Sequence, residues 1–222
     1  MPYIDFISEL HKQTKRDYLS RVNNKQYPKY KAAELSKKWD YDYWDGSRNI
    51  CYGGYKYLPG RWNNVISRMI EHYKLQKNSK ILDVGCGKGF FLKDFKKILP
   101  EIEINGLDIS KYAIENSPED IKKNIKLGNA TKLPWPDNYF DLVVSFNTFH
   151  NLYNFELEKA LIEFERVGKN KYICVESYRS EKEKVNLLYW QVTCEAFCNE
   201  KEWLWWFNKS NYTGDYSLIY FE

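Results

Sequence analysis

The strongest constraint on the fold is a glycine-rich turn between an apolar segment and a helical one. The turn lies in the run ILDVGCGKGFF, residues 81–91. Glycines let the backbone turn tightly and approach a ligand without an intervening side chain, and the next helix begins with free N–H groups. We therefore predict a buried strand, a ligand-binding turn and a helix, in that order.

Short apolar runs alternate with helical segments from residue 80 onward. The runs expected to form strands are residues 80–84, 101–107, 125–127, 140–146, 172–175 and 216–221. The segments 90–99, 109–117 and 157–167 are long enough for right-handed crossovers between parallel strands. The alternation predicts an α/β fold, with a parallel sheet covered by helices.

The first 60 residues differ in composition from the rest, because aromatic residues crowd between residues 41 and 62. We predict helices at residues 5–22 and 29–39, a loop, and an amphipathic helix at 62–73. The chain is accordingly divided into a cap segment, 1–61, and a core domain, 62–222. Within the core, residues 181–208 form a helical insertion on the substrate side, with helices at 181–198 and 201–208.

Length and composition exclude several classes of protein. The 222 residues suit one domain, and 43% hydrophobic with 29% charged residues indicates a folded chain. No apolar run approaches the roughly 20 residues that span a bilayer, and residues 1–10 lack a secretory core. An odd number of cysteines, five, predicts reduced thiols and a cytoplasmic location. A net charge of +4 permits a phosphorylated substrate but is weaker than that of typical nucleic-acid binders.

Three further features follow the predicted strands. Asp108 ends the second strand, where a carboxylate can accept both hydroxyls of a ribose. Gly128-Asn129-Ala130 ends the third strand, and Asn147-Thr148-Phe149-His150 follows the fourth. All lie at the carboxyl edge of the expected sheet, which is the edge where open α/β sheets bind ligands.

In this order the motifs resemble those of class I S-adenosylmethionine-dependent methyltransferases, of the small-molecule group that includes the ubiquinone and menaquinone enzymes. The resemblance covers at least residues 80–178. It implies a Rossmann-like, mostly parallel sheet of six or seven strands with helices on both faces, plus an N-terminal helical and aromatic cap. It also implies S-adenosyl-L-methionine as cofactor and S-adenosyl-L-homocysteine as product.

The resemblance assigns cofactor-binding roles to particular residues. The methionine end would be lined by Asp83, Gly85, Gly87 and Gly89. The ribose would be bound at Asp108, with Ile109 beside it, and the adenine would be flanked by Asn129 and Ala130. Asn147 would lie beside the methyl donor, Arg61 would pair with the methionine carboxylate, and Tyr52 would form a wall beside the donor methyl. Many relatives have Asp where this chain has Asn129, which can still donate and accept hydrogen bonds. An NAD-binding alternative is disfavoured because the turn reads Gly-x-Gly-x-Gly and lacks the dinucleotide spacing.

His150 is the candidate catalytic residue, because imidazole titrates in the range that suits a general base. The alternative is that it only packs in the loop. Glu176 could orient an acceptor or accept its proton, but an ion pair with Arg179 or a nearby lysine is the preferred alternative. No metal site is expected, since Cys194 and Cys198 alone are too few ligands for zinc.

We therefore expect methyl transfer to a small polar metabolite, with an oxygen acceptor favoured because of His150. A sugar or sugar-phosphate of surface-polysaccharide biosynthesis is the suggested acceptor. The alternatives are an RNA methyltransferase and a non-catalytic S-adenosylmethionine-binding module. Nucleic acid is disfavoured because the fourth strand lacks a following Asn-Pro-Pro-aromatic sequence. Membrane insertion is not expected, and a homodimer is a hypothesis based on a sheet that lacks an edge strand.

Overall fold

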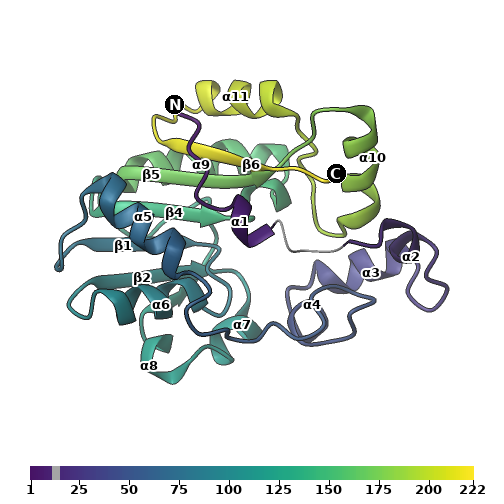
Figure 1. Ribbon diagram of the computed structural model, residues 1–222, viewed down its shortest axis with the longest axis horizontal. Coiled ribbons are helices and arrows are strands. Elements are labelled where there is room, and N and C mark those ends of the chain that lie inside the picture. Colours follow the sequence, from purple (N-terminus) through teal and green to yellow (C-terminus); the bar gives the residue numbers. More distant parts are fainter. Residues whose placement is uncertain (12–15) are drawn as a thin grey trace.

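Six parallel strands form the centre of the computed structural model, which describes residues 1–11 and 16–222 (Figure 1). The strands are β1 (Lys80–Val84), β2 (Glu103–Asp108), β3 (Ile125–Leu127), β4 (Phe140–Phe146), β5 (Gly168–Glu176) and β6 (Asp215–Ile219). Their order in the sheet is β3-β2-β1-β4-β5-β6. Because the connections reverse direction between β1 and β4, the carboxyl ends of these two strands form the switch point where such sheets bind ligands.

Helices cover both faces of the sheet. They are α1 (Ser8–His11), α2 (Tyr18–Val22), α3 (Lys29–Ser36), α4 (Tyr41–Trp44), α5 (Asn63–Tyr73), α6 (Phe90–Ile98), α7 (Lys111–Glu115), α8 (Glu119–Lys122), α9 (Asn154–Val167), α10 (Glu181–Trp190) and α11 (Glu200–Lys209), with a 3-10 turn at Phe149–Asn151. Alternate residues of β4 face opposite layers: Val143 packs with α9 and α11, and Leu142 and Val144 pack with α5 and α6. The prediction of a parallel sheet with helices on both faces is therefore confirmed, with six strands.

The predicted strand positions agree closely with the structure. The predicted bounds of β1, β3 and β4 are those observed, while β5 begins at Gly168, four residues before the predicted start. The last strand, β6, pairs parallel to β5 along its whole length, from Tyr172 opposite Asp215 to Glu176 opposite Ile219. The sheet described here thus has no antiparallel member.

The predicted helix at residues 181–198 is wrong in its second half, because α10 ends at Trp190. Beyond it, Val192 and Thr193 are β-branched residues with lower helix propensity. The chain then runs alongside the loop after β4, where the backbone N–H groups of Glu195 and Ala196 donate to the carbonyl oxygen of His150 at 2.9 and 3.0 Å. These long-range hydrogen bonds replace those that a longer helix would make.

The first residues of the chain contact the core layers. The Ile4 N–H donates to the Tyr216 carbonyl at 2.9 Å, and the Tyr216 N–H donates to the Pro2 carbonyl at 3.1 Å, so this segment covers part of the β6 edge. Phe6 and Ile7 are buried against α5 and the sheet. The division at residue 61 and the homodimer both stay predictions, but the edge that motivated the homodimer is partly paired within the chain.

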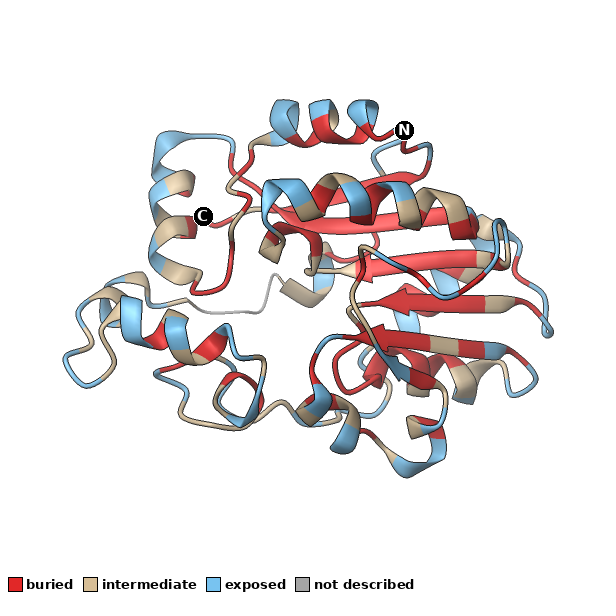
Figure 2. Ribbon diagram, turned by 180° about the vertical axis from the view of Figure 1, so that it is seen from behind, coloured by how far each residue is buried: buried red, intermediate tan, exposed pale blue. Residues whose placement is uncertain are grey.

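Residues 17–60 cover the carboxyl ends of the strands, toward which the arrowheads point (Figure 2). Within this segment α2 packs against α10, and α3 packs against α4. The predicted helix at residues 5–22 corresponds to α1 and α2, and its residues 12–15 lie outside the described residues. No helix in the described parts of the chain has both the length and the apolar character needed to cross a membrane.

The core packing predicts a large difference between two tryptophans of α11. Trp203 is fully buried and its Nε1 donates to the Glu176 carbonyl at 3.0 Å, whereas Trp205 is 56% exposed. Trp203→Ala should lower the free energy of unfolding by about 3–5 kcal/mol, because it leaves a cavity. Trp205→Ala should change it by about 0.5 kcal/mol or less. Urea unfolding of both variants tests this, and equal losses would contradict the described packing.

Candidate active site

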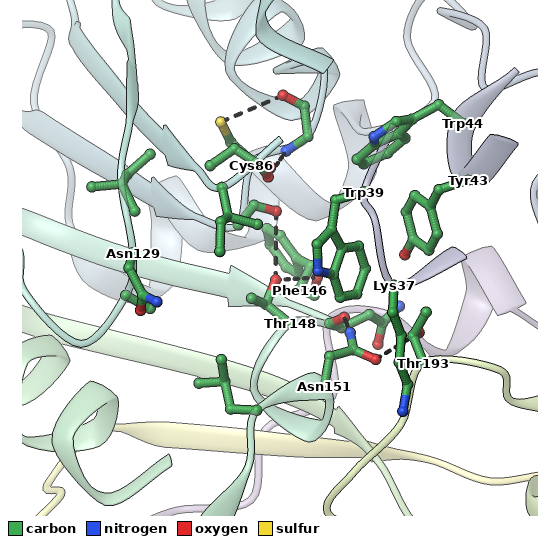
Figure 3. A pocket seen from close by; sticks show the side chains of 18 of the residues that line it. Lys37, Trp39, Tyr43, Trp44, Cys86, Asn129, Phe146, Thr148, Asn151 and Thr193 are labelled. Atoms are coloured by element: carbon green, nitrogen blue, oxygen red, sulfur yellow. Dashed lines mark hydrogen bonds between the residues drawn. The ribbon is translucent and has the colours of Figure 1, made fainter. Parts of the chain in front are cut away.

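A pocket of about 320 Å³ opens at the carboxyl ends of β1, β2 and β4 (Figure 3). Core residues form one side of it, and aromatic side chains of the segment 39–55 form the other. Its volume lies within the range of small-molecule sites. The predicted cofactor residues that line this first pocket are Gly85, Gly87, Asp108, Ile109, Asn129, Ala130, Asn147 and Tyr52.

The turn after β1 is fixed to the end of β2 by its backbone. The Gly85 N–H donates to the Leu107 carbonyl at 2.7 Å, and Gly85 has a φ of +79°. A Cβ on Gly85 would lie 2.0 Å from Oγ1 of Thr148, so a side chain cannot fit there. At Gly87, a Cβ would lie 2.7 Å from the ring of Trp44. Glycine at both positions lets the turn pack closely against the walls of the pocket.

The Asp108 carboxylate is held by two backbone donors. Its Oδ2 accepts from the Gly87 N–H at 2.7 Å and its Oδ1 from the Ser110 N–H at 2.8 Å. Burial raises the pKa of Asp108 to about 6, although these two N–H groups oppose the rise. Each carboxylate oxygen keeps a further lone pair for a hydroxyl donor. The geometry therefore fits a ribose diol at the pocket wall.

Three predicted cofactor residues, Asp83, Gly89 and Arg61, lie outside the wall of the first pocket. Asp83 is buried, its Oδ1 has no hydrogen-bond partner, and burial together with Asp108 raises its pKa well above the usual range. An amino group of a ligand at the turn would satisfy this oxygen. Gly89 precedes α6, where a Cβ would lie 2.7 Å from Ile121 and Ile125, so glycine is needed for packing. Their cofactor roles stay predictions.

The cap is tied to the core around the first pocket by hydrogen bonds that the sequence did not reveal. Trp44 Nε1 donates to Ser110 Oγ at 2.9 Å. The buried Lys88 ammonium pairs with Asp45 at 2.6 Å, and the Tyr112 hydroxyl donates to the same carboxylate at 2.8 Å. In the sequence, the crowding of aromatic residues between 41 and 62 indicates that this segment forms a wall of the pocket. The positions of these residues in the sequence could not identify Ser110 as the partner of Trp44 or Asp45 as the partner of Lys88.

A second pocket of about 270 Å³ adjoins the first. Both pockets share the side chains of Tyr43, Tyr52, Asn147, Asn151 and Thr193. In this shared wall, the Thr193 hydroxyl donates to Asn151 Oδ1 at 2.8 Å (Figure 3). Asn147 adopts a left-handed backbone with φ of +57°, a conformation that asparagine tolerates better than most residues.

His150 and Glu176 lie in the wall of the second pocket. His150 Nε2 is 3.5 Å from Glu176 Oε2, and His150 Nδ1 has no hydrogen-bond partner. Burial lowers the pKa of His150 to about 3 and raises that of Glu176 to about 8, while Arg16 and Gln191 oppose the rise. His150 Nδ1 is free of hydrogen bonds within the described residues, but a pKa of about 3 makes the imidazole a weak proton acceptor while Glu176 is uncharged, so the base role stays a prediction.

The preferred alternative for Glu176 was an ion pair with Arg179 or a nearby lysine, and neither pair is present within the described residues. Arg179 pairs with Glu183 and with Glu222 instead, and Glu176 accepts a hydrogen bond from Gln191. Arg61 was expected at the cofactor carboxylate, but its side chain lines the second pocket and not the first. Pairing of Arg61 with a cofactor carboxylate stays a prediction.

The structure gives no indication of a metal centre in the parts of the chain that it describes. Groups of three or more His, Cys, Asp or Glu residues placed to hold a metal ion are absent from residues 1–11 and 16–222. Cys194 and Cys198 are buried thiols without a disulfide, and they lie after the end of α10.

Residues 82–175 match a protein family described as a methyltransferase domain. Among curated relatives, an uncharacterised methyltransferase of Schizosaccharomyces pombe is 35% identical over 45% of this chain and 40% of its own length. The demethylmenaquinone methyltransferase of Symbiobacterium thermophilum is 31% identical over 53% of this chain and 50% of its own. The chain thus spans about half the length of these relatives or less.

Solved structures share the fold. The YcgJ protein from Bacillus subtilis superposes with a TM-score of 0.54 at 23% identity, covering 65% of this chain and 66% of that one. The MccD protein gives a TM-score of 0.54 at 25% identity, covering 69% and 72%. The chain therefore shares the fold of these proteins, and its residues 82–175 match a methyltransferase domain. It is similar to class I S-adenosylmethionine-dependent methyltransferases of the small-molecule group that includes the demethylmenaquinone methyltransferases.

The position of Asp108 predicts its effect on cofactor binding. Asp108→Ala should weaken binding of S-adenosylhomocysteine by about tenfold or more, because hydrogen bonds to a charged group contribute about 1.5–3 kcal/mol. Calorimetry on the purified protein measures this, with Asp137→Ala at an exposed carboxylate as the matched control. Equal affinities for the two variants would exclude Asp108 from the cofactor site.

The raised pKa of Glu176 predicts a pH dependence of stability. Because its pKa is about 8 when folded and near 4.5 when unfolded, the folded state retains a proton between these values. Stability from this group is present below pH 4.5 and is lost as the pH rises toward 8. Glu176→Gln cannot titrate, so the variant should gain more than about 1 kcal/mol relative to wild type between pH 5 and 9.

Thermal or urea unfolding of Glu176→Gln across this pH range tests the linkage. Glu101→Gln, at an exposed position just before β2, provides the matched control. A constant stability difference between Glu176→Gln and wild type from pH 5 to 9 would contradict the raised pKa.

Proposed function

We propose that the protein transfers a methyl group from S-adenosylmethionine to an oxygen of a small polar molecule. The supporting observation is the pair of adjoining pockets with a common wall at Asn147, Asn151 and Thr193. The first pocket carries the ribose-type carboxylate Asp108, and the second carries the buried pair His150 and Glu176. A donor in the first pocket and an acceptor in the second would meet at this wall.

The cofactor, when bound, supplies a methyl group attached to a sulfonium sulfur. As the bond between the methyl carbon and the acceptor oxygen forms, the C–S bond breaks and its electron pair stays on sulfur. The protein's task is to align the acceptor and to receive its proton. His150 Nδ1 is the proton acceptor in this proposal, and the Glu176 carboxylate would stabilise the resulting imidazolium across 3.5 Å. A hydroxyl acceptor requires such a base, whereas an amine need only bind unprotonated.

The polar second pocket favours a sugar or sugar-phosphate acceptor, of the kind used in surface-polysaccharide biosynthesis, over a quinone. Its wall holds four arginines together with His150 and Glu176. The five unpaired thiols are consistent with activity in the cytoplasm. An RNA methyltransferase and a non-catalytic cofactor-binding module remain the competing functions.

Transfer of a labelled methyl group tests the proposal. We expect the purified protein with methyl-labelled S-adenosylmethionine to label the small-molecule fraction of a cell extract, giving a methyl ether. Label in the RNA fraction would favour the RNA alternative. Cofactor binding without any labelled product would favour the non-catalytic module.

The base assignment predicts a loss of turnover without a loss of cofactor. His150→Gln should lower kcat by about 10²- to 10⁴-fold, the usual contribution of a general base, while the dissociation constant of S-adenosylhomocysteine stays within twofold. Glu176→Gln should abolish a rise of kcat with pH near 8, where the carboxylate ionises. Steady-state kinetics on the labelled acceptor, beside calorimetry, would show this. An unchanged kcat in His150→Gln would mean that the imidazole only packs.

A further inference from the structure

Three arginines converge on one aromatic ring at the second pocket. The guanidinium carbons of Arg16, Arg21 and Arg48 lie 6.0, 5.1 and 5.5 Å from the centre of the Trp190 ring. All four side chains line the pocket. They come from three separate parts of the chain: Arg16 and Arg21 from α2 and the residues just before it, Arg48 from the loop after α4, and Trp190 from the end of α10. Folding therefore assembles a local positive charge that is not apparent in the sequence.

This cluster lacks a counter-ion within the described residues. The arginines that form ion pairs there are Arg166 and Arg179, and none of the three cluster arginines is among them. The four residues outside the described ranges, Lys12-Gln13-Thr14-Lys15, contain no carboxylate. The one carboxyl group in the pocket wall is Glu176, whose pKa burial raises to about 8 although Arg16 opposes the rise, and it forms no ion pair with the three arginines in the described residues.

The cluster guanidinium groups also keep donors available. Arg21 uses Nη1 to bond the carbonyls of Asn49 and Ile50 at 3.3 and 2.8 Å. Arg48 uses Nη1 to bond the carbonyls of Cys51 and Tyr52 at 2.8 and 3.3 Å. Arg16 Nε is buried and has no hydrogen-bond partner among residues 1–11 and 16–222. A guanidinium has five N–H donors, so each of the three has donors left for a ligand.

Like charges that approach one another oppose folding unless an anion neutralises them. Burial and the neighbouring Arg48 lower the pKa of Arg21, while Cys51 acts in the opposite direction. The peptide carbonyls hold the side chains in place but carry no net charge. A doubly charged oxyanion would relieve the repulsion and satisfy the orphan Arg16 Nε, and phosphate matches the planar donor pairs of arginine.

We propose that Arg16, Arg21 and Arg48 form a phosphate-binding subsite, so that the acceptor is a small phosphorylated molecule. The proposal rests on the proposed function, because it assigns the acceptor of the same site. The phosphate would bind beside Trp190, with the rest of the acceptor reaching past His150 toward the shared wall at Asn147. A pocket of about 270 Å³ accommodates a small metabolite of this kind.

The test measures binding of inorganic phosphate by calorimetry, with acetate at equal ionic strength as the carboxylate arm. Wild type should bind phosphate and bind acetate at least about tenfold more weakly. Arg48→Gln and Arg16→Gln should each weaken phosphate binding by about tenfold or more, as expected when a charge-assisted contact is lost. Arg68→Gln, an exposed arginine of α5 that bonds the Asp5 carbonyl, should bind like wild type.

The outcomes separate this subsite from the proposed function. Arg48 is exposed, so its substitution should leave the fold intact even where Arg21→Gln does not. Binding of S-adenosylhomocysteine with no phosphate binding, or phosphate binding that the arginine variants do not change, would overturn the subsite alone. A wild-type protein that does not bind S-adenosylhomocysteine would overturn the proposed function instead. An RNA oligonucleotide that binds more tightly than phosphate, and loses affinity in Arg48→Gln, would overturn a small-molecule acceptor.

Discussion

The Asp108 carboxylate joins the strand ends that form the first pocket. One oxygen holds the turn after β1 through Gly87, and the other holds Ser110, the residue that caps α7. The Ser110 hydroxyl in turn accepts from the Trp44 indole and donates to the Trp39 carbonyl, so the aromatic cap is attached through the same residue. The glycine turn, the end of β2 and the cap thus share one hydrogen-bond network. A change at Asp108 would disturb both the ribose site and the wall that faces it.

A second buried polar pair organises the acceptor side. His150 and Glu176 follow β4 and end β5, two neighbouring strands whose carboxyl ends meet at one edge of the sheet. Burial disfavours the charged form of each group, which favours a neutral imidazole beside a carboxyl that ionises only near pH 8. Buried groups with pKa values displaced this far, in the wall of a pocket, are typical of functional sites. The pair is also expensive to bury, and a structural role alone gives little reason to keep both.

The sequence could predict the core because local pattern determines it. The bounds of β1, β3 and β4 were recovered from apolar runs, and most of the expected cofactor residues reached the first pocket because they end neighbouring parallel strands. Prediction failed where long-range contacts decide the local structure. The segment after Trp190 could not be separated from α10 by periodicity, since its course depends on hydrogen bonds to the His150 carbonyl. The arginine cluster could not be predicted either, because Arg16, Arg48 and Trp190 become neighbours only after folding.

The two pockets draw their walls from different parts of the chain. Core strands supply the cofactor side, from the Gly85 turn to Asn129, through backbone groups and short polar side chains. The acceptor side instead draws its charge from residues outside the matched domain, including Arg16, Arg48 and Trp190. Under the proposed function, relatives that share the core domain but differ in these flanking segments would keep the same donor and take another acceptor, so residues 82–175 would determine the donor and the cap with α10 the acceptor.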